Sequence, residues 1–147
     1  MSLEENKALI RKMYETLNKR NLAITDEFIA PDYIDHTNQV RGPEGVKQFI
    51  TQLLNSFSDF YVMIEDIIGE EDRVWVSLLY TMTHTGEYRG IAPTKKKITE
   101  RSVYIYHIAN GKVVEGKAVS DELDFLKQLG LIEYTETGKK LLTQNIS

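Results

Sequence analysis

Up to about residue 57, apolar side chains recur at the spacing of α-helices. Three helices are expected in this part of the chain, over residues 2–18, about 22–29 and 42–57. Ser2 and Glu5 fit a capping box at the start of the first helix. The third helix starts at Gly42 and Pro43, because proline is favoured in the first helical turn.

After residue 57 the apolar pattern changes from a period of 3.6 to a period of 2, which is typical of strands. Four strands are expected, over residues 60–68, 73–85, 98–109 and 112–120. The last two should form a hairpin, because Asn110-Gly111 is a strong signal for a two-residue turn. A short closing helix is expected after Ser120, with Gly130 beyond its end.

This order of elements predicts an α+β fold, in which N-terminal helices pack on a curved, mostly antiparallel four-stranded sheet. The concave face of such a sheet must be covered, and the three helices can cover it while leaving an internal pocket, as in a cone. Residues 1–134 are expected to form this single domain, and residues 135–147 a polar C-terminal tail.

The hairpin suggests which side chains face the pocket. If Ala109 lies opposite Lys112, a regular register places Asp121 opposite Glu100 and Lys117 opposite Tyr104, all on one face. Two carboxylates held close together in a poorly hydrated place raise at least one pKa from about 4, as a general base requires. Alternatively, Ser120-Asp121-Glu122 is also typical of a helix start, with acidic residues at its positive end.

Composition excludes several classes of protein and of site. The chain has 18 basic and 22 acidic residues, which argues against a nucleic-acid-binding protein. It has no cysteine, and the spacing of His36, His84 and His107 matches no metal motif, so we expect neither a metal nor another cofactor. No apolar run approaches the ~20 residues of a membrane span, and the first residues lack the pattern of a signal peptide. We therefore expect a cytoplasmic protein that binds neither nucleic acid nor a membrane.

Several short segments occur in the order seen in one known family. These segments are DYIDHT, RGPEGVKQFI, THTGEYRGIAPT, the strand before NGKVVEG, and SDELDFLKQLG. In this respect the chain, over about residues 5–132, resembles the SnoaL-like polyketide cyclases. The resemblance implies the α+β cone that this family shares with nuclear transport factor and ketosteroid isomerase.

The resemblance also implies an activity and site residues. Characterised cyclases of the family close a ring of an aromatic polyketide ester by intramolecular aldol condensation, without metal or cofactor. Their general acid/base is an aspartate after the last long strand, a position that Asp121 matches, and their cavity histidines match His36 and His84. The chain departs from the family at Lys117, where many members have a tryptophan that walls the cavity.

Two functional hypotheses follow. In the first, a cofactor-independent enzyme uses Asp121 as general acid/base, and His36, His84, Tyr104, Lys117 and Glu100 contact a small hydrophobic or polyketide-like substrate. Its reaction is cyclisation, or a related isomerisation or dehydration. In the second, the protein is a non-catalytic small-molecule-binding module with the same fold. In both we expect a homodimer, because the second sheet face, with Val103, Ile105, Val114 and Ala118, is too apolar to remain in water.

Overall fold

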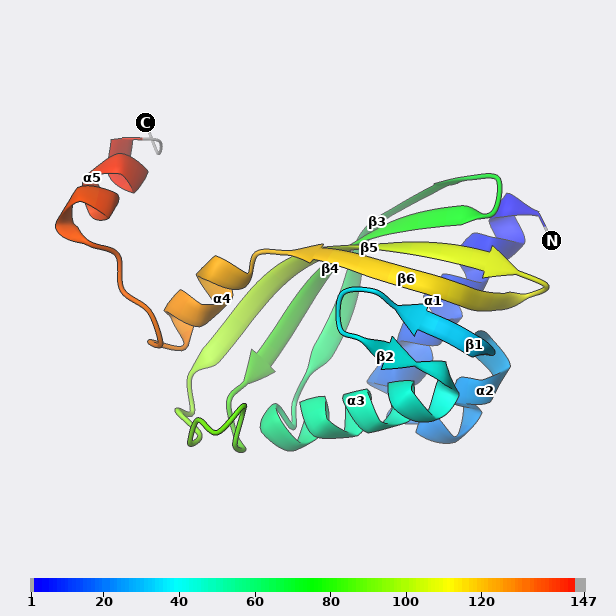
Figure 1. Ribbon diagram of the computed structural model, residues 1–147, viewed down its shortest axis with the longest axis horizontal. Helices are drawn as coiled ribbons and strands as arrows, with labels where there is room; N and C mark the ends of the chain where they lie inside the picture. The colour runs from blue at the N-terminus through cyan, green and yellow to red at the C-terminus, as the bar shows by residue number, and fades with distance from the viewer. Residues whose placement is uncertain (1, 145–147) are drawn as a thin grey trace.

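A computed structural model describes residues 2–144, in which helices cover one face of a curved sheet (Figure 1). The helical elements are α1 (Leu3–Asn18), the 3-10 turn η1 (Leu22–Ile24), α2 (Thr25–Phe28), α3 (Gly42–Ser56), α4 (Glu122–Gln128) and α5 (Glu136–Gln144). The strands are β1 (Ile29–Asp35), β2 (Val40–Arg41), β3 (Tyr61–Glu70), β4 (Arg73–Thr83), β5 (Lys97–Ala109) and β6 (Lys112–Ser120). The expected domain includes Met1 and the expected tail includes residues 145–147, and these four residues lie outside the described part of the chain.

The α+β fold is confirmed, but the prediction of four strands was wrong. Six strands form one sheet in the order β2-β1-β6-β5-β4-β3, and β1 runs parallel to β6. The segment of β1 contains Pro31, which argues against a strand because proline cannot donate to the ladder. The strand is tolerated because β2 pairs only with Ile34 and Asp35, so its ladder does not reach Pro31.

A β-bulge overturns the predicted register of the last hairpin. Ala109 lies opposite Lys112 as expected, but the register shifts between Ile108 and His107. From there on, Lys117 pairs with Ile105 rather than with Tyr104, and Ala118 takes the place opposite Tyr104. Because strand faces alternate, this shift of one residue moves Lys117 to the outer face of the sheet.

The same shift changes the position of Asp121. Its backbone N–H donates a hydrogen bond to the carbonyl oxygen of Arg101, at 3.2 Å, so Asp121 lies beside Arg101 and not opposite Glu100. The predicted pairing of Asp121 with Glu100 was therefore wrong, because a turn sequence fixes the register only as far as the first bulge.

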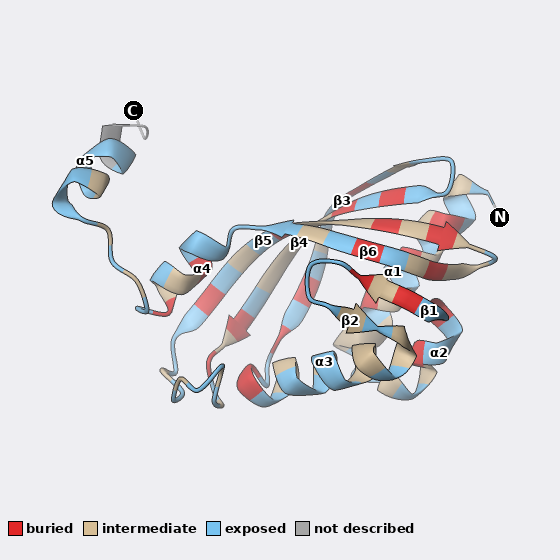
Figure 2. Ribbon diagram, in the orientation of Figure 1, coloured by how far each residue is buried: buried red, intermediate tan, exposed pale blue. Residues whose placement is uncertain are grey.

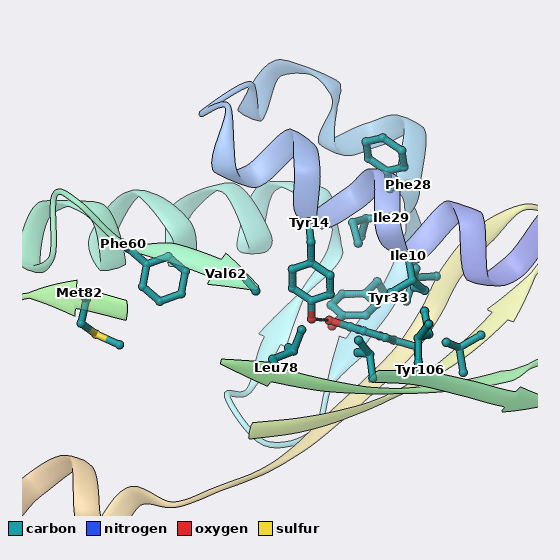
Figure 3. Packing of buried hydrophobic residues seen from close by; sticks show 14 of the residues in the cluster. Ile10, Tyr14, Phe28, Ile29, Tyr33, Phe60, Val62, Leu78, Met82 and Tyr106 are labelled. Carbon is teal, nitrogen blue, oxygen red and sulfur yellow. Dashed lines mark hydrogen bonds between the residues drawn. The ribbon is translucent and has the colours of Figure 1, made fainter. Parts of the chain in front are cut away.

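The hydrophobic core lies between the helices and the concave face of the sheet (Figure 2). Val74, Val76 and Leu78 of β4 are fully buried there, as are Ile10 of α1 and Phe57 after α3. Figure 3 shows Tyr14 reaching from α1 to Tyr106 on the sheet. Burial of this apolar surface stabilises the arrangement of helices over the sheet.

The two C-terminal helices differ in how they are attached to the sheet. α4 is attached to β5 by Gln128, whose side chain donates to the carbonyl oxygen of Thr99 at 2.7 Å and accepts its N–H at 3.0 Å. Beyond α4 the chain continues to α5, which projects away from the sheet (Figure 1). Among residues 2–144, no helix has both the length and the apolar character to cross a membrane.

Candidate active site

A cavity of about 1040 Å³ lies between the helices and the concave face of the sheet. This volume suits an organic molecule of moderate size, since typical ligand pockets measure about 300–1,000 Å³. Aromatic side chains supply much of the wall, among them Phe28, Phe57, Phe60, Tyr80, Tyr88 and Phe125. The cavity is therefore largely apolar, and a few polar groups stand out in it.

One polar group is a network around Asp35, at the end of β1. The Asp35 side chain is buried, and its Oδ1 accepts the backbone N–H groups of Thr37 and Asn38, each at 2.9 Å. Its Oδ2 accepts the Asn38 side-chain amide at 3.2 Å and the hydroxyl of Tyr104. Burial and the charge of Asp35 raise the pKa of Tyr104, so Tyr104 keeps its proton.

Two further phenols continue this network along the sheet. The ring of Tyr106 stacks on that of Tyr104, with centroids 5.0 Å apart and planes 9° apart. The hydroxyls of Tyr106 and Tyr14 are hydrogen-bonded to each other, and burial raises the pKa of both. Because one hydrogen bond uses one of the two hydroxyl protons, the other remains available for an oxygen atom in the cavity.

A second polar group lies further along β5, around Glu100. Tyr80 of β4 is directly opposite Glu100 in the antiparallel register, and both side chains line the cavity. Burial, and then the carboxylates at the start of α4, raise the pKa of Glu100 to about 7. Burial also raises the pKa of Tyr80, so this phenol stays a hydrogen-bond donor at neutral pH.

The predicted site residues fall into two sets. Glu100 and Tyr104 lie on the inner face of β5 and line the cavity, separated by about 13 Å along the strand at 3.3 Å per residue. Asp121 is an exposed residue at the N-cap of α4, where its Oδ1 accepts the N–H of Asp124 at 3.2 Å. Its side chain does not line the cavity, but its charge is among those that raise the pKa of Glu100.

The structure does not bring the other predicted residues to the cavity. His36 Nε2 lies 3.1 Å from Glu115 Oε2, and Lys117 is on the outer face of β6. His84 is fully buried behind the wall, with its ring centroid 5.4 Å from that of Phe57. Its Nδ1 accepts the N–H of Thr94 at 3.1 Å, which places the proton of the neutral ring on Nε2.

Sequence reasoning missed Asp35, Asn38 and Tyr80. The first two belong to an Asp-x-Thr-Asn turn, in which an aspartate accepting the following N–H groups is a common arrangement. The pairing of Tyr80 with Glu100 could not be derived, because the long connection between β4 and β5 leaves their register open.

Within residues 2–144, no group of three or more histidine, aspartate or glutamate side chains is arranged to hold a metal ion. The polar side chains that line the cavity are suited to acid/base chemistry and hydrogen bonding. Glu100 can accept and return a proton near neutral pH, and the phenols can donate to oxygen atoms of a ligand.

A family model described as SnoaL-like polyketide cyclase matches residues 7–129. The aklanonic acid methyl ester cyclase DnrD of Streptomyces peucetius is 28% identical over 129 residues, covering 83% of this chain and 88% of the relative. The nogalonic acid methyl ester cyclase of Streptomyces nogalater is 26% identical over 124 residues, covering 80% and 92%.

Among solved structures, that of AclR from Streptomyces galilaeus, a hydroxylase candidate, superimposes with a TM-score of 0.82. The two chains are 26% identical, and the match covers 99% of this chain and 94% of AclR. Proteins with this one fold thus have different assigned reactions, and the fold alone does not determine the reaction of this chain.

Proposed function

Because the chain belongs to the SnoaL-like polyketide cyclase family, we propose that it closes a ring in a polyketide ester by a cofactor-independent intramolecular aldol reaction. The observation that carries this proposal is the pair formed by Glu100 and Tyr80 on the cavity wall. A carboxylate that titrates near neutral pH is suited to remove a proton from carbon, and a phenol opposite it is suited to stabilise the resulting enolate.

The proposed reaction needs only proton transfers and one new carbon–carbon bond. A carboxylate, Glu100 or Asp121, takes a proton from the carbon next to a carbonyl, and the electron pair of the C–H bond forms the enolate. The enolate carbon then attacks a second carbonyl of the same molecule. The alkoxide formed there takes the proton back, so the product is an isomer of the substrate. If the base instead returned the proton to a different carbon of the enolate, the reaction would be an isomerisation without ring closure.

The polar network at Asp35 has a positioning role in this proposal. The hydroxyl of Tyr104 donates a hydrogen bond to Asp35 and accepts one from the Asn38 amide at 2.8 Å, which leaves it a lone pair for a hydroxyl of the ligand. A long, flat polyketide can contact Glu100 at one end and Tyr104 at the other. His84 supports the wall from behind, while His36 and Lys117 would need to move to reach the ligand.

The charges around the cavity favour an ester over a free acid. Four carboxylates line it, from Asp35, Glu87, Glu100 and Glu122, and the one basic residue among the lining side chains is Arg89. Arg89 is already paired with Glu122, at 3.7 Å. A substrate with an ionised carboxylate would meet unfavourable charge there, whereas a methyl ester would not. The names of both curated relatives include a methyl ester.

Turnover of aklanonic acid methyl ester tests this function. The wild-type protein should convert the ester to a product of unchanged mass and altered chromatographic retention. The double variant Glu100→Gln/Asp121→Asn, which removes both candidate bases, should lose about 100-fold or more of the rate. Glu70→Gln, the same substitution on the exposed end of β3, is the matched control and should keep the wild-type rate.

The alternative is a non-catalytic module that binds a small molecule in the same cavity. The size and aromatic wall of the cavity suit binding as well as catalysis. In that case the wild-type protein would bind the ester without converting it, and the double variant would bind it with nearly unchanged affinity.

We also propose that two copies pair through the outer face of the sheet. The exposed side chains on this face include Trp75, Ile68, Met63 and Val119, of which Trp75 is 47% and Val119 is 70% exposed. Trp75 lies opposite both Ile68 and Ile105 in the register, so the apolar side chains are contiguous across three strands. Such a patch favours association. Ala118 was expected on this face, but the bulge turns it toward the cavity, so it does not belong to the exposed patch.

A further inference from the structure

We infer that Glu100, rather than Asp121, is the catalytic base that removes the carbon-bound proton. This inference rests on the proposed function and assigns its first step to one residue. Glu100 projects from the inner face of β5, opposite Tyr80, and lines the cavity. Among the described side chains and backbone groups, which exclude the side chains beyond residue 142, none forms a hydrogen bond with its carboxylate, so both oxygens are free to meet a ligand.

The other carboxylates near the cavity are already engaged or point elsewhere. Asp35 is saturated by hydrogen bonds from two backbone N–H groups, one amide and one phenol. Asp121 is exposed and caps α4, outside the cavity wall. Glu87 and Glu122 line the cavity but are exposed, and Glu122 is paired with Arg89. Among these five residues, Glu100 alone combines a position on the wall, partial burial and an unengaged carboxylate.

Titratable groups face Glu100 from three elements, namely α4, β4 and the loop before β5. The start of α4 presents the carboxylates of Glu122, Asp121 and Asp124. Tyr80 faces it from β4 and remains neutral, and Tyr88 faces it from the loop before β5, next to Arg89. The negative charges of α4 favour the protonated form of Glu100, and the single positive charge nearby is partly neutralised by Glu122.

Asp121 becomes a positioning residue in this scheme. Its charge helps to hold the pKa of Glu100 near 7, where the carboxylate and the acid are both well populated. Glu100 can then take the proton from carbon as a carboxylate and return it to the alkoxide as an acid. The C–H electron pair passes into the enolate, then into the new carbon–carbon bond, and Glu100 ends in its starting form.

Two measurements test the assignment without the natural substrate. The first is a carboxyl NMR titration of protein labelled with ¹³C-glutamate, in wild type, Glu122→Gln and Glu70→Gln. The second is deuterium uptake by 2-tetralone, a small ketone with an acidic carbon-bound proton, in wild type, Glu100→Gln, Asp121→Asn and Glu70→Gln. Glu100→Gln keeps the size of the side chain and serves to assign the Glu100 signal.

The inference predicts a Glu100 midpoint near pH 7 that falls in Glu122→Gln and is unchanged in Glu70→Gln. It predicts that Glu100→Gln slows deuterium uptake by about 100-fold or more, whereas Asp121→Asn slows it by less than about 10-fold. A midpoint near the ordinary 4.5, equal uptake with wild type and Glu100→Gln, or a larger loss in Asp121→Asn would each overturn it. Failure of the wild type to convert aklanonic acid methyl ester would overturn the proposed substrate and leave these results to decide on Glu100.

Discussion

Tyr80 lies directly opposite Glu100 in the register of β4 and β5, on the face of the sheet that lines the cavity. Side chains directly opposite each other in an antiparallel pair have Cβ atoms about 5 Å apart, so a ligand atom can contact both. Burial keeps the phenol protonated, and the same environment brings the carboxyl pKa to about 7. The pair thus combines a proton acceptor with a hydrogen-bond donor at one place.

Tyr80→Phe should therefore reduce kcat more than it changes KM. The substitution removes the donor to the enolate oxygen but keeps the aromatic ring in the wall, so we expect a loss of about 10- to 100-fold in kcat. Steady-state kinetics with aklanonic acid methyl ester measure this split. Tyr134→Phe, beyond α4, is the matched control. An unchanged kcat in Tyr80→Phe would exclude the phenol from the reaction.

Stability should depend on pH through Glu100. Its pKa is raised in the folded state, from the ordinary 4.5 to about 7, so the folded protein binds a proton there more tightly than the unfolded chain. The contribution of Glu100 to stability is fully present below about pH 4.5 and is lost as the pH rises through about 7. The free energy of unfolding of Glu100→Gln minus that of wild type should accordingly increase across this window. Urea denaturation at several pH values measures it, and a difference that stays constant would mean that Glu100 titrates normally.

Asp35 should be important for stability as well as for the site. Asp35→Ala removes the buried carboxylate that accepts the backbone N–H groups of Thr37 and Asn38, in a turn whose own residues are exposed. Since a hydrogen bond to a charged group contributes about 1.5–3 kcal/mol and water can reach the freed N–H groups, we expect a loss of about 1–3 kcal/mol in the free energy of unfolding. Asp32→Ala, an exposed aspartate on the same strand, is the control and should cost far less. Equal losses in the two variants would show that the Asp35 network does not stabilise the fold.

The proposed dimer contact can be tested by placing a charge on the outer face of the sheet. Trp75→Arg places a charge in the middle of the exposed apolar patch, and we expect it to convert a dimer to a monomer in sedimentation velocity. Lys19→Arg, on the exposed end of α1, controls for general effects of substitution. A wild-type protein that sediments as a monomer at micromolar concentration would refute the proposed pairing.

The helices and the central strands could be predicted from sequence because their signals are local. The capping box at Ser2 and Glu5 is present, with hydrogen bonds of 2.9 and 3.1 Å, and α3 starts at Gly42 as predicted. The Asn110-Gly111 turn also joins β5 to β6, with both residues at positive φ. Each of these structures is determined by residues that lie close together in the sequence.

The site could be predicted only in part, because its geometry depends on contacts between distant segments. The bulge after Ala109 exchanged the faces of Lys117 and Ala118, and no local pattern indicates it. Glu100 was found as a pocket residue, but its partner Tyr80 comes from another strand across a long connection. The helix-start interpretation of Asp121 agrees with its capping of α4, and it was the alternative to a catalytic role.

The rate of ring closure of aklanonic acid methyl ester as a function of pH, measured in excess EDTA, tests the central claim most directly. Acid/base catalysis by a cavity carboxylate predicts a rate that is unaffected by chelation and rises with pH to a plateau, with its half-maximum near pH 7. A rate that is lost in EDTA and restored by added metal, or a profile that is flat between about pH 5 and 9, would contradict it.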